Sequence, residues 1–285
     1  MGASHFATST AVEPLGDGRY RADLGAEWNC PIVPHGGFVT ATATRAMEAE
    51  LRDESQRLRS ITTVFAAQVN AGPVEIDVTM LRKGRSMSQL TATLRNIDAT
   101  AGHTSVAVFG SVRNGFEFTE LTPPPDLTPP EDTPSFRDPA PPGFERDPFP
   151  FWELVEGRPC IGHPPWGEQP HVREALRADW FRFDDPPRDD DGRWDPLAVL
   201  TMCDMMPGAV FERMGPEHDF YGPSADITVH MFGDAYSEWL LGVNRARHAG
   251  EGYASVDMEI WDMHRGEPAL VAYATQMMFF TQIDW

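Results

Sequence analysis

The stretch that decides the fold is residues 194–211, WDPLAVLTMCDMMPGAVF. Asp195 followed by Pro196 is the usual pairing of an N-cap with a first helical residue. The rest of the stretch is almost entirely apolar or small, and a helix that is apolar on all sides is buried. The pattern therefore predicts a helix in the protein core, with Asp204 as its only charged residue after the N-cap.

A carboxylate in such a helix is costly to bury unless it is hydrogen-bonded or its pKa shifts. Leu197, Leu200 and Asp204 are spaced i, i+3, i+7, so they fall on one stripe of the helix. Asp204 is therefore a candidate functional acid. The alternative is that Asp204 caps a turn, because Pro207, three residues later, disturbs the helical hydrogen bonds near it.

The composition excludes several classes of function. The chain has 285 residues and a net charge of −20, without a Lys/Arg cluster, so no nucleic-acid partner is expected. Cys30, Cys160 and Cys203 are odd in number and unpatterned, which indicates a reducing compartment. No apolar run reaches membrane-spanning length, and the first residues do not resemble a signal peptide. We expect a cytoplasmic protein with no membrane span, no metal and no cofactor.

Before the middle of the chain, the expected order of elements is a strand pair, a long helix and four antiparallel strands. Residues 6–13 and 18–24 read as the strand pair, with a turn at Gly16-Asp17-Gly18. His35-Gly36-Gly37 then opens a helix, FVTATATRAMEAELR. The four strands are expected over residues 60–69, 74–81, 87–94 and 104–112.

The same order returns after residues 119–150, which are dense in proline and acid and have no periodicity. Because proline removes backbone donors and restricts φ, that segment is expected to lack regular structure. The later elements are a strand, the buried helix and four more strands, over residues 175–183, 195–211, 224–232, 239–247, 253–262 and 269–280.

The repeat also holds in its spacing. Ser60 to Val74 is 14 residues, as is Ser224 to Glu238; Gly84 to Gly110 is 26, as is Gly250 to Gln276. Internal duplication of a helix wrapped by a sheet predicts an α+β fold with two halves joined edge to edge into one sheet, both helices on one side. We expect the N-terminal half over residues 1–118, a Pro-rich linker over 119–166 and the C-terminal half over 167–285.

This pattern resembles the double hot-dog acyl-CoA thioesterases of the type II, medium-chain class. The resemblance covers nearly the whole chain outside the linker. It depends on HGGFV at the start of the first helix and on five further segments. These are GRSMSQLTATL (84–94), MCDMMPGAV (202–210), PSADITV (223–229), EWLLGVNRARHAGEGYASVDMEIWD (238–262) and ALVAYATQMMF (269–279).

The resemblance implies hydrolysis of acyl-CoA by a water that is activated by Asp204, Ser224 and Gln276. Asp204 acts as the general base, with its pKa raised by burial, and the other two orient the water. Asp226 and Thr228 are rival candidates on the same strand as Ser224. The first-half positions that match Asp204, Ser224 and Gln276 by spacing are Thr44, Ser60 and Gly110.

Other residues are candidates for substrate binding. The N–H groups of Gly36 and Gly37, next to His35, are suited to an oxyanion at a helix N-terminus. Arg85, with Arg82 and Lys83, is a candidate contact for CoA phosphates, and Met202, Met205 and Met206 are candidates to line an acyl tunnel between the halves. We expect the acyl-CoA substrate as partner and a homo-oligomer.

Two alternatives to hydrolysis stay open. Double hot-dog dehydratases and hydratases pair a His from the first half with an Asp on the second helix, as His35 and Asp204 would here. However, Gly36 and Gly37 follow that His at once, which departs from the dehydratase pattern. The other alternative is a non-catalytic acyl-binding protein, because a fold does not carry its function with it.

Overall fold

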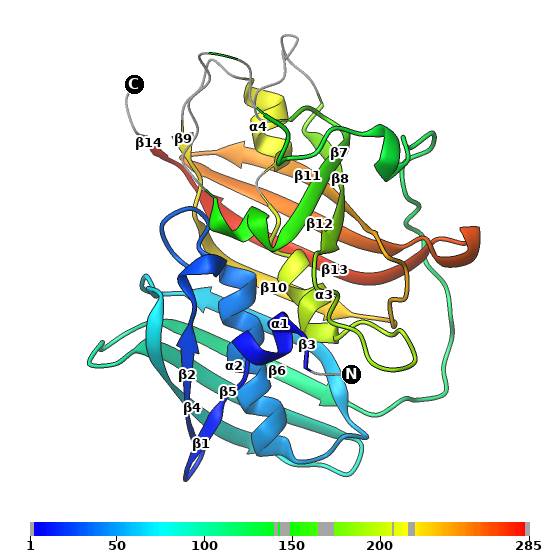
Figure 1. Ribbon diagram of the computed structural model, residues 1–285. Helices are drawn as coiled ribbons and strands as arrows, with labels where there is room; N and C mark the ends of the chain where they lie inside the picture. Colours follow the sequence, from blue (N-terminus) through cyan, green and yellow to red (C-terminus); the bar gives the residue numbers. More distant parts are fainter. Residues whose placement is uncertain are drawn as a thin grey trace.

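The first half of the chain builds one helix and a curled sheet around it (Figure 1). The computed structural model describes residues 3–139, 142, 149–164, 174–206, 208–215 and 220–282. A short helix α1 (His5–Ser9) precedes the strands β1 (Glu13–Gly16) and β2 (Arg19–Leu24). The long helix is α2 (Gly36–Leu51), and it is followed by β3 (Arg57–Phe65), β4 (Gly72–Arg82), β5 (Met87–Asn96) and β6 (His103–Gly110).

The predicted hairpin turn at Gly16-Asp17-Gly18 is confirmed, but the prediction of a strand over residues 6–13 is wrong. Helix α1 forms there because the Ser4 side chain accepts a hydrogen bond from the Ala7 N–H and caps the first turn. Phe6 then packs edge-on against Trp28, and both are buried. The local cap and this tertiary contact outweigh the alternation in the sequence.

The second half contains two short helices where the sequence predicted one long helix. Its elements are β7 (Val155–Ile161), β8 (Leu176–Phe183), α3 (Pro196–Met202), α4 (Gly208–Met214), β9 (Phe220–Tyr221), β10 (Ser224–Met231), β11 (Leu240–Gly250), β12 (Tyr253–Asp262), β13 (Ala269–Phe279) and β14 (Thr281–Gln282). Single 3₁₀ turns occur at Ala26–Trp28, Pro130–Asp132, Pro150–Glu153 and His264–Gly266.

Helix α3 begins as predicted, with Asp195 as the N-cap, whose side chain accepts from the Leu197 N–H. It ends at Met202, because the next backbone donors turn to nearer carbonyls: Asp204 N–H bonds Thr201 O and Met205 N–H bonds Met202 O. Asp204 therefore lies in a turn after the helix and not within it. The effect predicted for Pro207 falls outside the described residues.

The two halves share one sheet of twelve strands, in the order β1-β2-β4-β5-β6-β3-β10-β13-β12-β11-β8-β7, which confirms the predicted double hot-dog architecture. A separate two-stranded pair is formed by β9, which precedes β10, and β14, which follows β13. The seam between the halves is the antiparallel pair β3–β10, where Thr63 lies opposite Ile227. Thr63 lies three residues after Ser60, and Ile227 lies three residues after Ser224, so the two residues are equivalent in the two halves. A local two-fold axis therefore passes through the seam.

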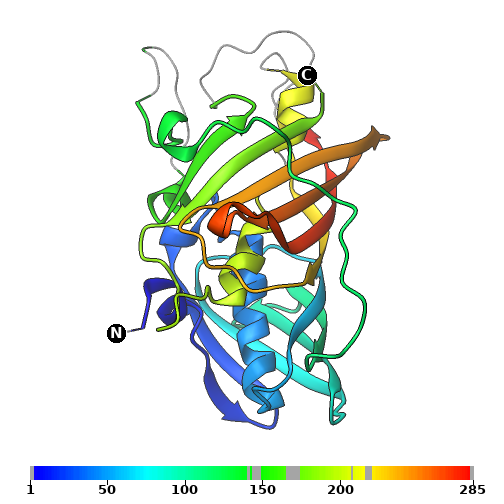
Figure 2. The ribbon, with the colours of Figure 1, turned by 90° about the vertical axis from the view of Figure 1, so that its right-hand side faces the viewer.

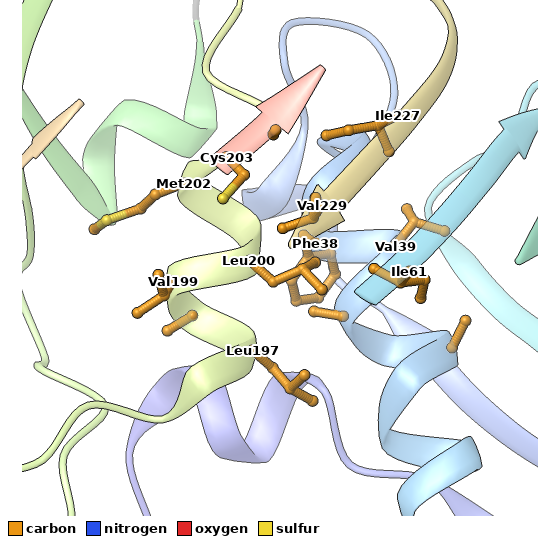
Figure 3. Packing of buried hydrophobic residues seen from close by; sticks show 14 of the residues in the cluster. Phe38, Val39, Ile61, Leu197, Val199, Leu200, Met202, Cys203, Ile227 and Val229 are labelled. Atoms are coloured by element: carbon orange, nitrogen blue, oxygen red, sulfur yellow. The ribbon is translucent and has the colours of Figure 1, made fainter. Parts of the chain in front are cut away.

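Helices α2 and α3 pack against each other on the inner face of this sheet. Leu197, Leu200 and Cys203 of the α3 segment are buried beside Phe38 and Val39 of α2, and the seam strands close the cluster from the other side with Ile61, Ile227 and Val229 (Figure 3). Met202 also lies in this core, fully buried. Burial of the helix pair therefore joins the two halves.

In the second half, the opposite face of the sheet is also covered. Trp180, Leu241, Val243 and Trp261 form a separate buried cluster there, and Leu121 and Leu127 of the Pro-rich segment pack against it. The Trp180 indole donates to the carbonyl of Thr128 at 2.9 Å. Figure 2 shows the segment running along this side of the molecule.

The described part of residues 119–150 contains only the 3₁₀ turn at Pro130–Asp132 and the start of the next one, at Pro150. Strand β7 lies within residues 119–166, the range that the sequence analysis assigned to the linker, and pairs with β8. Its Pro159 is tolerated because β7 is the last strand of the sheet, where one side of the backbone needs no partner.

Candidate active site

The Asp204 carboxylate contacts both halves of the molecule. Its Oδ2 accepts a hydrogen bond of 2.6 Å from the backbone N–H of Gly37, at the start of α2. Its Oδ1 accepts a short hydrogen bond from Nε2 of Gln276 on β13. Asp204 is 9% exposed and Gln276 is 3% exposed. The acid from one half is therefore fixed at the helix N-terminus of the other.

The two glycines at the start of α2 allow this close approach. A Cβ on Gly36 would lie 2.7 Å from Asp204 Oδ2, and a Cβ on Gly37 would lie 2.7 Å from the carbonyl oxygen of Thr201. Both distances are below van der Waals contact, so any larger residue would push α2 away from the carboxylate. The pair Gly36-Gly37 is required for the packing of α2 against the turn that carries Asp204.

Burial dominates the electrostatics of the site. It raises the pKa of Asp204 to about 7, although the hydrogen bonds from Gly37 and Gln276 act in the opposite direction. His35 Nδ1 is 3.8 Å from Asp204 Oδ2, and burial lowers the pKa of His35 to about 4. The imidazole is therefore neutral near pH 7, and it stacks on Phe151 with ring centroids 4.5 Å apart.

Two polar atoms beside the carboxylate are buried and have no hydrogen-bond partner among the described residues. They are Gln276 Oε1 and His35 Nδ1. Buried polar groups are normally hydrogen-bonded, and leaving one unpaired costs about 1–3 kcal/mol. Unpaired atoms on two sides of a carboxylate of raised pKa form a site that can bind a small polar group such as a water or a substrate carbonyl.

Ser224 lies on the Gln276 face of the sheet because of a bulge in β10. Ser224 is opposite Met278 and Ile227 is opposite Gln276, and the register shifts between Ser224 and Asp226. Directly opposed residues share a face, so the bulge turns Ser224 inward, where strict alternation would leave it outside. Ser224 is half-buried and makes no side-chain hydrogen bond within the described part of the chain.

The rival residues on β10 lie on the other face. The Thr228 hydroxyl hydrogen-bonds the Thr62 hydroxyl at 2.9 Å in an exposed position across the seam. Asp226 Oδ1 accepts from the Met277 N–H at 2.9 Å, also in an exposed position. Among the described residues, neither side chain is hydrogen-bonded to Asp204, and both lie across the sheet from the buried site.

Arg85 does not lie near Asp204. It is exposed in the turn between β4 and β5, where the neighbouring Lys83 donates to the carbonyl of Leu51 at the C-terminus of α2. Gly37 is almost the whole helix away, about 20 Å at 1.5 Å per residue. The phosphates of CoA are themselves separated from the thioester carbonyl by the pantetheine arm, so the contact of Arg85 with CoA phosphates stays a prediction.

Sequence reasoning missed three residues that border the site. The aromatic ring of Phe65 lies 3.1 Å from the point where a Cβ on Gly36 would be. Burial, and then the charge of Asp204, raises the pKa of Cys30 to about 12, and burial raises that of Tyr221, with Cys30 and Asp204 adding to it. No local pattern marks these residues, because the three come together from separate parts of the chain.

The first-half equivalent of Gln276 is Ser105 and not Gly110. Gln276 lies opposite Ile227, and Ser105 lies opposite Thr63, the residue equivalent to Ile227. Counting 26 residues from the turn glycines Gly84 and Gly250 matched Gly110 to Gln276. That match is wrong because the β12–β13 hairpin is longer than the β5–β6 hairpin. The hydroxyls of Ser105 and Thr63 are hydrogen-bonded to each other at 2.7 Å, so each already has a partner.

The described residues contain neither a candidate metal site nor a candidate membrane helix. No group of three or more His, Cys, Asp or Glu side chains is placed to hold a metal ion there. In the same residues, no helix is long and apolar enough to cross a membrane.

Comparison with known families gives two matches that together cover most of the chain. Residues 24–111 match the acyl-CoA thioesterase N-terminal domain, and residues 125–280 match the acyl-CoA thioesterase C-terminal domain. A search of curated proteins found no match.

Solved structures share the fold over nearly the full length. A conserved protein of unknown function with a hot dog fold from Alicyclobacillus acidocaldarius has a TM-score of 0.81 and 26% identity, with 98% of each chain covered. A putative thioesterase II from Thermobifida fusca has a TM-score of 0.78 and 20% identity, with 99% of each chain covered. An acyl-CoA thioesterase II, TesB2, from Mycobacterium marinum has a TM-score of 0.74 and 20% identity, covering 97% of this chain and 98% of that one.

Proposed function

The chain belongs to the acyl-CoA thioesterase family, a family of thioester hydrolases, and from that premise we propose that Asp204 is the general base of acyl-CoA hydrolysis. The observation that carries the proposal is the pair of contacts made by its carboxylate, to Gly37 of one half and to Gln276 of the other. A carboxylate with a pKa of about 7 is basic enough to take a proton from water near neutral pH.

In the proposed reaction, a water lies between Asp204 and Gln276 Oε1, with the Ser224 hydroxyl as a further partner. Asp204 removes one proton as the water oxygen bonds to the thioester carbonyl carbon. The tetrahedral intermediate collapses, the C–S bond breaks, and the CoA thiolate receives the proton from Asp204. The products are a carboxylic acid and CoA, and no cofactor is consumed.

The oxyanion of the intermediate needs hydrogen-bond donors. The Gly37 N–H already donates to Asp204, so it is not free for the substrate in this state. We assign the role to the N–H of Gly36, which opens α2 and whose missing side chain leaves the approach open. His35, neutral and next to the carboxylate, is a second donor if its Nδ1 carries the proton.

A single-turnover reaction in H₂¹⁸O tests the role of Asp204 directly. General-base catalysis places one ¹⁸O in the fatty acid in the first turnover and none in the protein. If Asp204 attacked the carbonyl itself, an enzyme-bound anhydride would form, and hydrolysis at the Asp204 carbonyl would leave ¹⁸O in the protein. Mass spectrometry of product and protein separates the two outcomes.

Release of free thiol from acyl-CoA, followed with a thiol-reactive dye, separates hydrolysis from the alternatives. A dehydratase would leave the thioester intact, and so would a non-catalytic acyl-binding protein. A panel of acyl-CoA chain lengths in the same assay defines the substrate. We further propose that the enzyme works in the cytoplasm, in fatty-acid metabolism, as a homo-oligomer; size-exclusion chromatography with light scattering tests the oligomeric state.

A further inference from the structure

His103 is a buried histidine at a position where the fold needs only an apolar side chain. It begins β6, on the inner face of the sheet, and is 7% exposed. Its Nδ1 is buried and makes no hydrogen bond to any described residue. An unpaired buried polar atom destabilises a protein, so its presence calls for a functional reason.

The second half provides a direct comparison. His103 lies opposite Phe65, and the equivalent pair across the local two-fold axis is Val229 opposite Ala274. Val229 and Ala274 are both fully buried among apolar neighbours. The same place in the same fold therefore packs well without a polar group, and the imidazole is not required for folding.

The position of His103 connects it to the active site through one residue. The rings of Phe65 and His103 meet edge to face, with centroids 4.7 Å apart. The far edge of Phe65 faces Gly36, where a Cβ would lie 3.1 Å from the Phe65 ring and 2.7 Å from Asp204 Oδ2. His103 therefore lies one aromatic ring away from the carboxylate that is proposed to act on the thioester.

On the other side of α2, the hollow beside Phe6 and Trp28 is lined by Leu154, Phe183 and Asp184 and not by Asp204, and packed aromatic rings separate it from the carboxylate. The rings of Trp28 and Phe38 are stacked with their centroids 4.3 Å apart. Phe6 and Phe151 pack edge-on against Trp28. All four rings are fully buried or nearly so. By contrast, Phe65 is only partly buried, so the approach to Asp204 that a bound substrate can use is the Phe65 side.

We propose that His103 is a specificity-determining residue, which donates or accepts a hydrogen bond with a polar group of the bound acyl-CoA. This inference rests on the proposed function of the Asp204 site. The imidazole is neutral near pH 7, so it suits an uncharged hydroxyl, oxo or amide group and not a phosphate. Such a group is present in two parts of the substrate, a substituted acyl chain and the amides of the pantetheine arm.

The test compares wild type, His103→Phe and His103→Gln on hexanoyl-CoA and 3-hydroxyhexanoyl-CoA. Loss of one neutral hydrogen bond should raise KM by roughly 3- to 10-fold in His103→Phe while kcat stays nearly constant. His103→Gln, which keeps a polar group, should restore part of the binding. A rise in KM for the hydroxylated substrate alone places the partner on the acyl chain, and an equal rise for both places it on the pantetheine arm.

Thermal unfolding distinguishes this role from a structural one. His103→Phe removes an unpaired buried polar atom, so Tm should stay the same or rise. His230→Phe, an exposed histidine on the outer face of β10, is the matched control and should leave KM unchanged. Unchanged KM on both substrates, or a fall in Tm with kcat and KM affected together, would overturn the proposal.

Binding can also be measured without turnover, by titrating the same two substrates into Asp204→Asn and into Asp204→Asn with His103→Phe. A higher Kd in the double variant than in Asp204→Asn supports the proposal, and equal Kd values contradict it. Failure of the proposed function shows differently, as full activity of Asp204→Asn with His103 intact. In that case the KM comparison between wild type and His103→Phe still decides the role of His103.

Discussion

The two ends of the α2–α3 helix pair carry a carboxylate each, but in opposite electrostatic settings. At one end, Asp195 caps α3 and forms an ion pair with the guanidinium of Arg45, which also contacts Glu48 at 3.2 Å. At the other end, Asp204 contacts Gly37 and Gln276, and no Lys or Arg among the described residues pairs with it. Burial raises the pKa of Glu48 to about 7 even beside Arg45, so the two ends differ in the presence of a cation and not in the presence of a raised pKa.

The sheet beneath the helices shows the same contrast. Next to Asp204 the β-strand positions hold Gln276 and the Phe65–His103 pair. The equivalent first-half position of Gln276 is Ser105, whose hydroxyl is satisfied by Thr63. Thr44, which spacing matches to Asp204, likewise bonds its hydroxyl to the carbonyl of Thr40 at 2.7 Å. The first-half residues Ser105 and Thr44 thus have hydrogen-bonded hydroxyls, whereas Gln276 Oε1 has no partner among the described residues.

The largest expected effect comes from removing the uncompensated charge. Asp204→Asn should lower kcat by roughly 100-fold or more and leave KM nearly unchanged, because the general base acts in the transition state and not in substrate binding. Asp226→Asn, which changes a half-buried acid on the outer face of the same half, is the matched control and should stay close to wild type. Full activity of Asp204→Asn, with loss of activity in Asp226→Asn, would move the base to β10.

The pH dependence should follow Asp204. Because the base must be ionised in the free enzyme, kcat/KM should rise roughly tenfold per pH unit below about pH 7 and level off above it. His35 stays neutral over this range, since its pKa is lowered to about 4. A flat profile between pH 5 and 8 in the wild type would contradict a base with this raised pKa.

Ionisation of Asp204, which raises activity, should lower the stability of the folded protein. The folded-state pKa of Asp204 lies above its ordinary value of 3.8, so the folded protein holds the proton more tightly than the unfolded chain. The stability that this proton contributes is present below about pH 4 and is lost as pH rises to about 7. Asp204→Asn should therefore gain stability relative to wild type over that window, by at most about 4 kcal/mol. Tm measured against pH for both proteins checks it.

A smaller effect is expected from the amide. Gln276→Ala should lower kcat by roughly 10-fold, because it positions the water and is one of several groups that do so. Ser105→Ala, at the equivalent place in the first half, should keep full activity. Equal losses of kcat in the two variants would mean that Ser105 serves catalysis as Gln276 does. The contrast between the two halves of the molecule would then be wrong.

The smallest effect is expected at the compensated end. Arg45→Ala removes the ion pair with Asp195, in which Arg45 is about a quarter exposed, so the loss of stability should be about 1 kcal/mol or less. The kcat should not change, because Asp204 lies at the other end of α3. Chemical denaturation and the thiol-release assay measure the two quantities, and a marked fall in kcat would show that the two ends are coupled.

Sequence patterns predicted the elements that depend on local signals. The start of α3 at Asp195-Pro196, the start of α2 after His35 and the strands around the Gly84 turn all follow from capping, glycine and alternation. The errors lie where tertiary contacts override those signals. Alternation over residues 6–13 gave a strand, but the Ser4 cap and the burial of Phe6 make a helix.

The candidate site was predictable only in part. The resemblance identified Asp204 and Gln276, which the fold brings into hydrogen-bond contact from the turn after α3 and from β13. Ser224 was ambiguous, because a bulge cannot be read from a polar/apolar alternation. The distance between Arg85 and Asp204 was not predictable, because the sequence does not say which end of α2 the β4–β5 turn reaches.

By itself, the sequence determined the duplicated α+β architecture, the buried helix start and an acid without a neighbouring cation in the chain. These depend on composition and periodicity, which are local properties. Only the tertiary structure decided which atoms the acid meets. Gly37 and Gln276 lie far from Asp204 in sequence, and the joining of the two halves at the β3–β10 seam brings them within hydrogen-bond contact. Burial then raises the pKa of Asp204, because desolvation is a property of the assembled surroundings and not of any one residue.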